Sequence, residues 1–478
     1  MFNRQKIADI IEQKRKTFIH VSDCIWDYAE TRFEEFRSAD LLCKTLEEEG
    51  FSVERGVGGM ETAFIGSYGS GEPVVAILGE YDALSGLSQD RGIASHHPIK
   101  QGGNGHGCGH NLLGTGSLAA AVAVRHFMEE NQIKGTIRYY GCPAEEGGSG
   151  KTIMVREGLF DDVDTAISWH PYSFNAVASV TNVANYQVYF KFKGKAAHAA
   201  GSPHLGRSAL DALELMNIGA NFLREHIIPE ARLHYAITNS GGLAPNVVQA
   251  EAEVLYMVRA PELEQVDEIY HRVCKIARGA AMMTETEVDI IFDKGCSNLI
   301  PNRTLAAVMY DNYRKVGVPE FNEEEKAFAR QIRTTMPEPD KKSILRMLSQ
   351  LPVDKNLIQK IKEQELSTVL MPYINKTFRM TGSTDVGDVS WIVPTVQCAV
   401  NCFAMGTQLH SWQAVAQGGT SIGHKGMLHA GKVMAATAVD ILLQPEVIDQ
   451  AKAELKENLD GANYVCPIPT EIKPALSR

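Results

Sequence analysis

Hydrophobic and polar residues follow two different rhythms along the chain. From about residue 50 to residue 170, short apolar runs with strand character alternate with loops and helix-like segments. The run at 74–78 leads into the sequence GEYDAL, and the segment LLGTGSLAAAVAVRHFMEE has the Ala-rich composition of a helix. Alternating strands and helices predict an α/β fold in which a mostly parallel sheet is covered by helices on both faces.

The rhythm changes near Tyr186, where polar and apolar residues begin to alternate as in a half-exposed strand. The following segments read in turn as a helix, two strands joined by a turn, an amphipathic helix and a final strand. This βαββαβ order is that of the ferredoxin-like split arrangement. We therefore predict a second domain at 186–297, inserted into a first domain made of 1–185 and 298–478, with a charged helical insertion at about 320–375.

Composition and charge exclude several classes of partner. At 478 residues the chain is too long for one compact core, and 44% hydrophobic with 22% charged residues is typical of a soluble globular protein. A formal net charge of -11 argues against nucleic acid and anionic membranes. The first residues show no signal-peptide pattern, and no later run could span a bilayer. Nine cysteines without a disulfide framework make the cytoplasm the expected compartment.

Candidate chemistry gathers where the apolar runs of the first region end. Asp82 follows one run, Glu145 and Glu146 follow another, and His170 closes a third. Ligands of open α/β sheets bind beyond the carboxyl ends of the strands. We therefore expect these four side chains to converge on one site.

The stretch GHGCGHNLLG contains three further residues of metal-ligand type within five positions. His106, Cys108 and His110 alternate, so their side chains would point the same way in an extended chain. The spacing alone is balanced between a metal site and a set of buried core residues. Whether this stretch binds metal therefore depends on whether other metal-ligand residues occur elsewhere in the chain.

Several motifs taken together resemble one superfamily along nearly the whole chain. They are GEYDAL, GHGCGHN, AEEGGSGK, SWHP, GKAAHAAGSPHLGRSALDA and TQLHSW. The sequence is similar to the aminoacylase and carboxypeptidase-G superfamily of dinuclear metallohydrolases, which includes hippurate hydrolase and the auxin-conjugate amidohydrolases. The longer stretches CPAEEGGSGKTIMVREGLFDDVD and STDVGDVSW resemble its p-aminobenzoyl-glutamate hydrolase branch, of the B-subunit type. Asn111, where most amidohydrolases of the superfamily carry Asp, favours the same branch.

The resemblance implies a metal-dependent amidohydrolase that cleaves p-aminobenzoyl-glutamate to p-aminobenzoate and glutamate. Two alternatives remain: hydrolysis of other N-acyl amino acids or dipeptides, and a non-catalytic partner subunit of an active paralogue. The implied partner is a second copy of the chain or an A-type paralogue.

The resemblance also implies two divalent metal ions and their ligands. The implied ligands are Cys108, His110, Glu146, His170 and His410. His106 matches no ligand of the superfamily, and His424 is the alternative to His410. A Cys ligand favours zinc, whereas the resemblance favours manganese. Asp82 is expected to orient a histidine ligand, and its competing interpretation is a simple strand-end cap.

The adjacent carboxylates Glu145 and Glu146 are expected to divide two roles. Like charges side by side repel unless a cation or proton separates them. Glu146 would bind metal, while Glu145 would accept the proton of the attacking water and pass it to the leaving amine. The competing interpretation is a solvated surface pair.

The inserted domain is expected to act as a lid and a dimerisation surface. The resemblance implies that His198, in the AAHA motif, stabilises the oxyanion across the interface between two subunits. It also implies that Asn246 and Arg259 hold the substrate carboxylate, against the alternative of a salt bridge from Arg259 to Glu262. Two residues of the SPHLGR motif, His204 and Arg207, are candidates for further substrate contacts.

Overall fold

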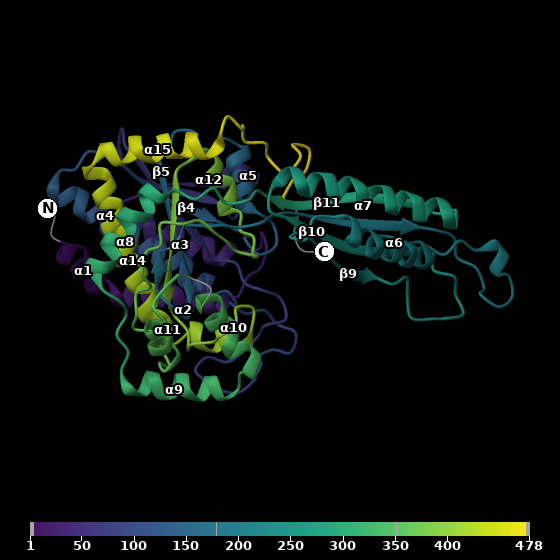
Figure 1. Ribbon diagram of the computed structural model, residues 1–478, viewed down its shortest axis with the longest axis horizontal. Helices are drawn as coiled ribbons and strands as arrows, with labels where there is room; N and C mark the ends of the chain where they lie inside the picture. Colours follow the sequence, from purple (N-terminus) through teal and green to yellow (C-terminus); the bar gives the residue numbers. More distant parts are fainter. Residues whose placement is uncertain (1–3, 178, 350–351, 475–478) are drawn as a thin grey trace.

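The computed structural model of the protein describes residues 4–177, 179–349 and 352–474. Figure 1 shows two parts: a broad α/β part, and a narrow unit that projects from one side of it. The narrow unit, residues 184–296, is called the inserted unit below, and the rest is called the main body.

Seven strands of the main body form one sheet in the order β1-β2-β4-β3-β5-β13-β6. Their bounds are β1 Ser52–Arg55, β2 Phe64–Ser70, β3 Val74–Glu80, β4 Gly135–Cys142, β5 Thr165–Tyr172, β6 Ala176–Val177 and β13 Thr395–Asn401. The pairings that join β4, β3, β5 and β13 are parallel, whereas β1-β2, β2-β4 and β13-β6 are antiparallel.

The prediction of a mostly parallel sheet is therefore wrong, because the sheet is mixed. Only residues 71–73 separate β2 from β3. A parallel return needs a crossover of a dozen residues or more, so a connection this short reverses the chain direction. The parallel centre of the sheet carries the functional loops described below.

Helices cover both faces of this sheet. One face packs against α4 and α14, which lie side by side, and against α3 and α8, while α5 and α12 cover the other. The helices α1 and α2 pack against α4 and α14. Their bounds are α1 Arg4–Gln13, α2 Arg15–Tyr28, α3 Phe36–Glu48, α4 His110–Asn131, α5 Gly150–Arg156, α8 Arg303–Val316, α12 Val386–Ile392, α13 Trp412–Gly418, α14 Ser421–Leu443 and α15 Pro445–Leu459. In the described ranges, α14 alone is long and apolar enough to cross a membrane, but 83% of its best window is buried, as in a core helix.

The inserted unit is a four-stranded antiparallel sheet with two helices on one face. The strands lie in the order β11-β8-β10-β9, and the chain order is βαββαβ. Their bounds are β8 Ala184–Lys193, α6 Ala209–Leu223, β9 Arg232–Asn239, β10 Glu251–Ala260, α7 Leu263–Thr284 and β11 Glu287–Cys296. Alternate strand residues pack against α6 and α7 to form a separate core. β9 is an edge strand and is largely exposed.

Three helices lie in the segment predicted as a helical insertion. They are α9 Glu323–Thr334, α10 Glu338–Ser349 and α11 Lys355–Lys362. After α11 the chain returns through β12 Phe378–Arg379, which pairs in parallel with β7 Val180–Thr181. Because β7 comes shortly before β8, this pairing brings the return close to the base of the inserted unit. The three helices themselves lie at the lower end of the main body in Figure 1.

Candidate metal centre

Five donor side chains from four separate segments meet at one end of the main-body sheet. Cys108 lies in the loop before α4, and His110 is the first residue of that helix. Cys108, His110 and His170 form one group of three donors, and Cys108, Glu146 and His410 form another. Within each group the donor atoms all lie within 4.8 Å of one another. Cys108 belongs to both groups, so its sulfur lies between two adjacent candidate ion positions.

Two histidines of the cluster are oriented as metal binding requires. His110 Nδ1 donates to Asp82 Oδ1 at 2.8 Å, and His170 Nδ1 donates to the carbonyl oxygen of Pro171 at 2.9 Å. Because each Nδ1 is held by an acceptor, each ring turns its Nε2 toward the other donors. Asp82 therefore has the orienting contact expected of it.

Two buried polar atoms of the cluster lack a hydrogen-bond partner. They are His110 Nε2 and Glu146 Oε1. His110 Nε2 lies 3.3 Å from Glu80 Oε2 without a hydrogen bond. A ring nitrogen that faces a carboxylate requires a proton or a cation between the two, because buried polar groups are otherwise paired. The donor set and its orphaned atoms therefore fit divalent metal.

The two adjacent glutamates have opposite electrostatic environments. Burial, with the charges of Glu80 and Glu146, raises the pKa of Glu145 to about 8. Burial opposes ionisation of Glu146 as well, but the contact with His410, at 3.3 Å, and the charge of His110 lower its pKa to about 2. The structure thus separates the pair into one carboxyl that keeps its proton near neutral pH and one that is ionised.

The sequence analysis did not predict a buried ion-pair network that lies next to the donor cluster. Lys151 Nζ lies 2.8 Å from Glu80 Oε1 and 2.5 Å from Asp385 Oδ1, and all three side chains are at most 2% exposed. Each residue sits inside a motif that carried the resemblance: GEYDAL, AEEGGSGK and STDVGDVSW. The sequence feature that could have revealed this network is Lys151, a lysine within a motif that otherwise predicts burial. A fully buried lysine requires charged partners.

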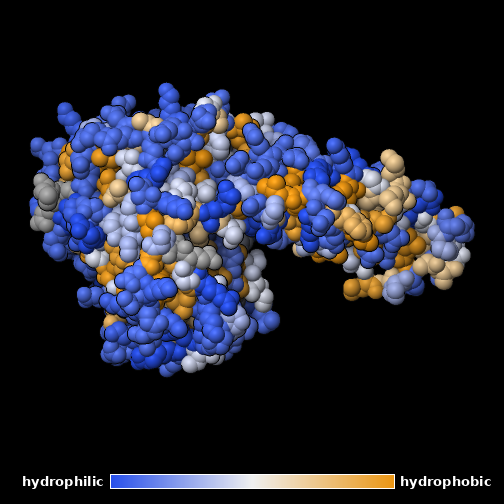
Figure 2. All heavy atoms as spheres, viewed as in Figure 1, coloured by the Kyte–Doolittle hydropathy of each residue, from blue (hydrophilic) through white to orange (hydrophobic). Residues whose placement is uncertain are grey.

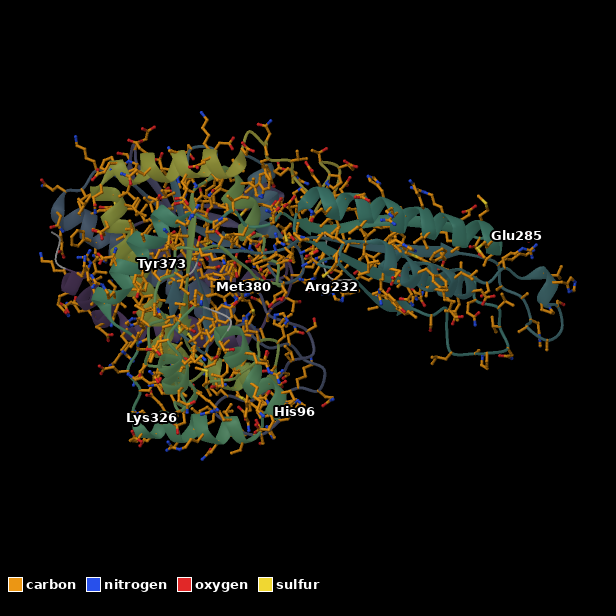
Figure 3. All side chains as sticks on the ribbon, viewed as in Figure 1. His96, Arg232, Glu285, Lys326, Tyr373 and Met380 are labelled. Carbon is orange, nitrogen blue, oxygen red and sulfur yellow. The ribbon has the colours of Figure 1, made fainter. Side chains whose placement is uncertain are left out.

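A cavity of about 580 Å³ opens from the cluster and reaches the base of the inserted unit. Cys108, Glu145, Glu146, His170 and His410 all line it. Its apolar wall includes Leu84, Tyr172, Phe174, Leu348, Met371, Ile374, Phe378, Met380 and Leu409. Met380 lies on the side of the main body that faces the inserted unit (Figure 3).

Arg259 reaches the cavity from the inserted unit. Its guanidinium donates to Ser383 Oγ at 3.2 Å and to Met257 Sδ at 3.1 Å, and it forms no ion pair with a described residue. The alternative salt bridge to Glu262 is not formed, because the Glu262 side chain caps the first turn of α7. Arg259 therefore offers an unneutralised cation to the cavity.

The structure does not bring the other predicted substrate residues to the cavity. His198, His204 and Asn246 are exposed at the outer part of the inserted unit. Arg207 pairs there with Glu285 at 2.9 Å, and Glu285 marks the outer end of the unit in Figure 3.

Two histidines are excluded from the cluster by their partners. His106 is buried and contacts the carbonyl oxygen of Ile25 at 2.9 Å, and it belongs to neither donor group. His424 Nε2 contacts Asp23 Oδ1 at 3.0 Å. Of the two histidines considered for the last donor position, only His410 therefore joins the cluster.

The family of the chain follows from comparison with known proteins. The profile of Peptidase family M20/M25/M40 matches residues 76–414, a span that includes the whole donor cluster. The chain belongs to this family of metallopeptidases and amidohydrolases. The family implies bound divalent metal, in agreement with the donor set.

Individual relatives refine the comparison. The chain is 53% identical to the B-type subunit of p-aminobenzoyl-glutamate hydrolase from Escherichia coli over 98% of both chains. It is 26% identical to the A-type subunit of that hydrolase, also from Escherichia coli, over 58% of this chain and 72% of the relative. A solved dinuclear metal-binding M20 peptidase from Bacillus subtilis shares the fold, with a TM-score of 0.53, 15% identity, and coverage of 90% of this chain and 99% of the other.

Proposed function

We propose that the cluster is a dinuclear centre and that the protein uses it as an amidohydrolase. The observation that carries the proposal is the pair of donor groups that share Cys108. One ion would be held by Cys108, His110 and His170, and the other by Cys108, Glu146 and His410. Three protein donors leave coordination positions open for water and substrate.

Zinc and manganese are the two candidate ions. Thiolate and imidazole donors favour zinc, while the carboxylate and the family resemblance are compatible with manganese. When bound, the ions would lower the pKa of a coordinated water and polarise the amide carbonyl. Asp82 supports the centre twice, because it orients His110 and accepts a hydrogen bond from the backbone N–H of Glu146 at 2.9 Å.

Glu145 is the proposed general base. It lines the cavity next to the donors but belongs to neither of the groups that share Cys108. A carboxyl whose pKa lies near neutrality can accept a proton from the attacking water and return it to the leaving amine. Ion binding would add positive charge beside Glu145 and favour its ionised, proton-accepting form.

The proposed substrate is p-aminobenzoyl-glutamate, which would be cleaved to p-aminobenzoate and glutamate. The name of the 53%-identical relative supports it. So does the cavity, which has aromatic residues on its apolar wall and Arg259 at the base of the inserted unit. The aromatic acyl group would pack against Tyr172, Phe174 and Phe378, since aromatic rings favour such surfaces. Arg259 would bind the α-carboxylate with its forked donors.

The inserted unit is the proposed ferredoxin-like lid and dimerisation domain, spanning 186–297 in the domain division predicted above. The cavity and the outer end of β8 are separated by residues 185–193, or about 26 Å of strand. His198 lies beyond that end, so it would serve as oxyanion donor to the centre of a neighbouring protomer. Asn246 would move with it, because its carbonyl accepts from the N–H of Ala199 at 3.0 Å.

The neighbour would be a second copy of the chain or an A-type paralogue, in a cytoplasmic enzyme. The 26%-identical A-type relative supports the heteromer. In that assembly His204 would add a substrate contact. Arg207 could do so only by leaving Glu285.

The test combines hydrolysis with metal analysis. The metal-loaded chain, by itself and mixed with an A-type paralogue, is assayed on p-aminobenzoyl-glutamate, benzoyl-glycine and a dipeptide. We expect preferred cleavage of the first. Cys108→Ala should lose both ions and His170→Ala one, whereas the control Cys466→Ala should keep both. Failure to cleave any acyl amino acid, with both ions bound and the A-type paralogue present, would overturn the proposal.

A further inference from the structure

Three neighbouring strands of the inserted unit send polar side chains to one edge of the cavity. Arg259 of β10 lies in register with Asn185 of β8, and Asn185 lies in register with Cys296 of β11. Lys294 of β11 lies opposite Gln187, two residues further along β8. Arg259, Asn185 and Lys294 all line the cavity. The base of the inserted unit thus contributes two cations and an amide to one side of the candidate centre.

A β-bulge directs Lys294 into the cavity. Phe292 and Lys294 oppose consecutive residues of β8, so Asp293 is an extra residue in β11. Without the bulge, residues 292 and 294 would point to the same face of the sheet. With it, Phe292 packs toward the core of the inserted unit and Lys294 faces the cavity.

The bulge is fixed against the main body. Asp293 accepts two hydrogen bonds from the Arg32 guanidinium, at 3.0 and 2.9 Å, and both side chains are at most 9% exposed. Gln187 also donates to Asp293 at 2.8 Å. The position of Lys294 is therefore set by a buried contact between the two parts of the protein.

Lys294 is buried and forms no ion pair with a described carboxylate, although its charge helps to lower the pKa of Glu146. The residue is 7% exposed, and its Nζ donates to the backbone carbonyl of Glu146 at 2.7 Å. An ammonium group has three donors, so two remain for a ligand. Neither Lys294 nor Arg259 forms an ion pair with a carboxylate of any described residue. Between them, Asn185 Oδ1 is buried and has no hydrogen-bond partner.

We infer that Lys294 binds the side-chain carboxylate of the amino acid that is released, so that the cavity selects acyl amino acids with an acidic side chain. This inference rests on the proposed function, in which Arg259 holds the α-carboxylate. A ligand that displaces water from the cavity must neutralise the cations it covers, because an uncompensated buried charge is costly. A substrate with two carboxylates neutralises both cations, whereas one with a single carboxylate leaves one of them unpaired.

The geometry is compatible with one carboxylate for each cation. Arg259 and Lys294 lie on strands separated by β8, so their backbones are about 10 Å apart across the sheet. Long side chains can approach a glutamate from the two ends of this span. The guanidinium suits the α-carboxylate next to the scissile amide, and the ammonium, a point charge, suits the more mobile side-chain carboxylate.

The experiment compares p-aminobenzoyl-glutamate with p-aminobenzoyl-glutamine, which has the same shape and one carboxylate fewer. The wild-type enzyme should prefer the glutamate amide by about 30-fold in kcat/KM, the scale of a hydrogen bond to a charged group. Lys294→Gln keeps an N–H donor for the Glu146 carbonyl but removes the charge, and it should reduce that preference to near unity. Because the measurement is the ratio of the two kcat/KM values, an effect of the substitution on metal loading changes both values equally and cancels.

Two further variants separate the role of Lys294 from that of Arg259 and from a general effect of charge. Arg259→Gln should lower kcat/KM for both amides and leave their ratio near the wild-type value. Lys191→Gln removes an equivalent charge from β8 outside the cavity and should change neither quantity. Equal cleavage of both amides by the wild type, or an unchanged ratio in Lys294→Gln, would overturn this inference alone. A fully metallated enzyme that cleaves neither amide would overturn the proposed function, and the inference with it.

Discussion

The main body and the inserted unit hold their candidate site residues in contrasting ways. In the main body, the donors come from segments as distant as 108 and 410 yet meet within a few ångströms. In the inserted unit, the candidate residues are divided between the base of the sheet, where Arg259 lies, and the outer end, where His198 lies. One chain therefore contains a complete donor cluster but only part of the proposed substrate site.

The cause lies in how each sheet is covered. Helices bury both faces of the main-body sheet, so charged groups near it must be paired inside the protein. The inserted sheet has helices on one face, and the unit carries exposed apolar residues that Figure 2 shows as orange areas over its surface. The most exposed of them are Phe222, Leu243, Met282 and Met283. Such a surface suits a partner protomer, whereas the main body needs none to assemble its cluster.

The largest effect is expected from the carboxylate that the main body supplies in cis. Glu145→Gln keeps the shape of the side chain but cannot accept the proton of the attacking water. Turnover should fall by about 10²- to 10⁴-fold, with both ions retained in elemental analysis. Glu157→Gln, at a surface position of the main body, serves as the control. Unchanged turnover at matched metal content would remove Glu145 as the base.

A second comparison sets a buried ion pair of the main body against an exposed one of the inserted unit. Lys151→Met leaves two buried carboxylates, Glu80 and Asp385, without their cation. Breaking a buried pair in this way costs about 3–5 kcal/mol in the free energy of unfolding. Lys193→Met, which removes the surface partner of Asp289, should barely change it. Urea titrations of both variants would reveal equal stabilities if the contrast were mistaken.

A pH dependence should also belong to the main body. Burial lowers the pKa of His429, on α14, to about 4, whereas an unfolded histidine titrates near 6.5. As the pH falls below 6.5, the unfolded chain binds the proton first, so up to about 3 kcal/mol of stability is lost between pH 6.5 and 4. His429→Gln should flatten this part of the stability profile, and His271→Gln, on exposed α7, should not. A parallel loss in both variants would contradict the assignment.

The smallest effect tests whether the inserted unit completes a neighbouring site. His198→Ala and Glu145→Gln are each expected to be inactive alone. In a dimer with shared sites, exchange of protomers creates mixed pairs with one intact composite site, so about a quarter of the wild-type activity should return. No recovery after exchange has been demonstrated by mass spectrometry would place His198 outside catalysis or in the site of its own chain. If an A-type paralogue is the obligate partner, the two changes are placed on opposite chains of the heteromer.

The element order could be predicted from the sequence because it depends on local periodicity. The apolar runs before Asp82 and Glu145 form β3 and β4, and the run that closes at His170 lies in β5. The alternating segment near Tyr186 is β8. Strand direction in the main sheet was not predictable in the same way, since pattern does not record which neighbour a strand pairs with. The bulge at Asp293 likewise has no signature in the hydrophobic pattern, although it decides where Lys294 points.

By itself the sequence determined the types of secondary structure, the family, and the identity of five donors that the structure gathers into one cluster. These depend on residue spacing and on motifs that lie within short segments. Tertiary structure alone decided that Lys151 bridges Glu80 and Asp385, that His410 rather than His424 joins the cluster, and that His198 lies far from the cavity of its own chain. Contacts between residues hundreds of positions apart set the local charge and burial, and no local pattern of side chains records them.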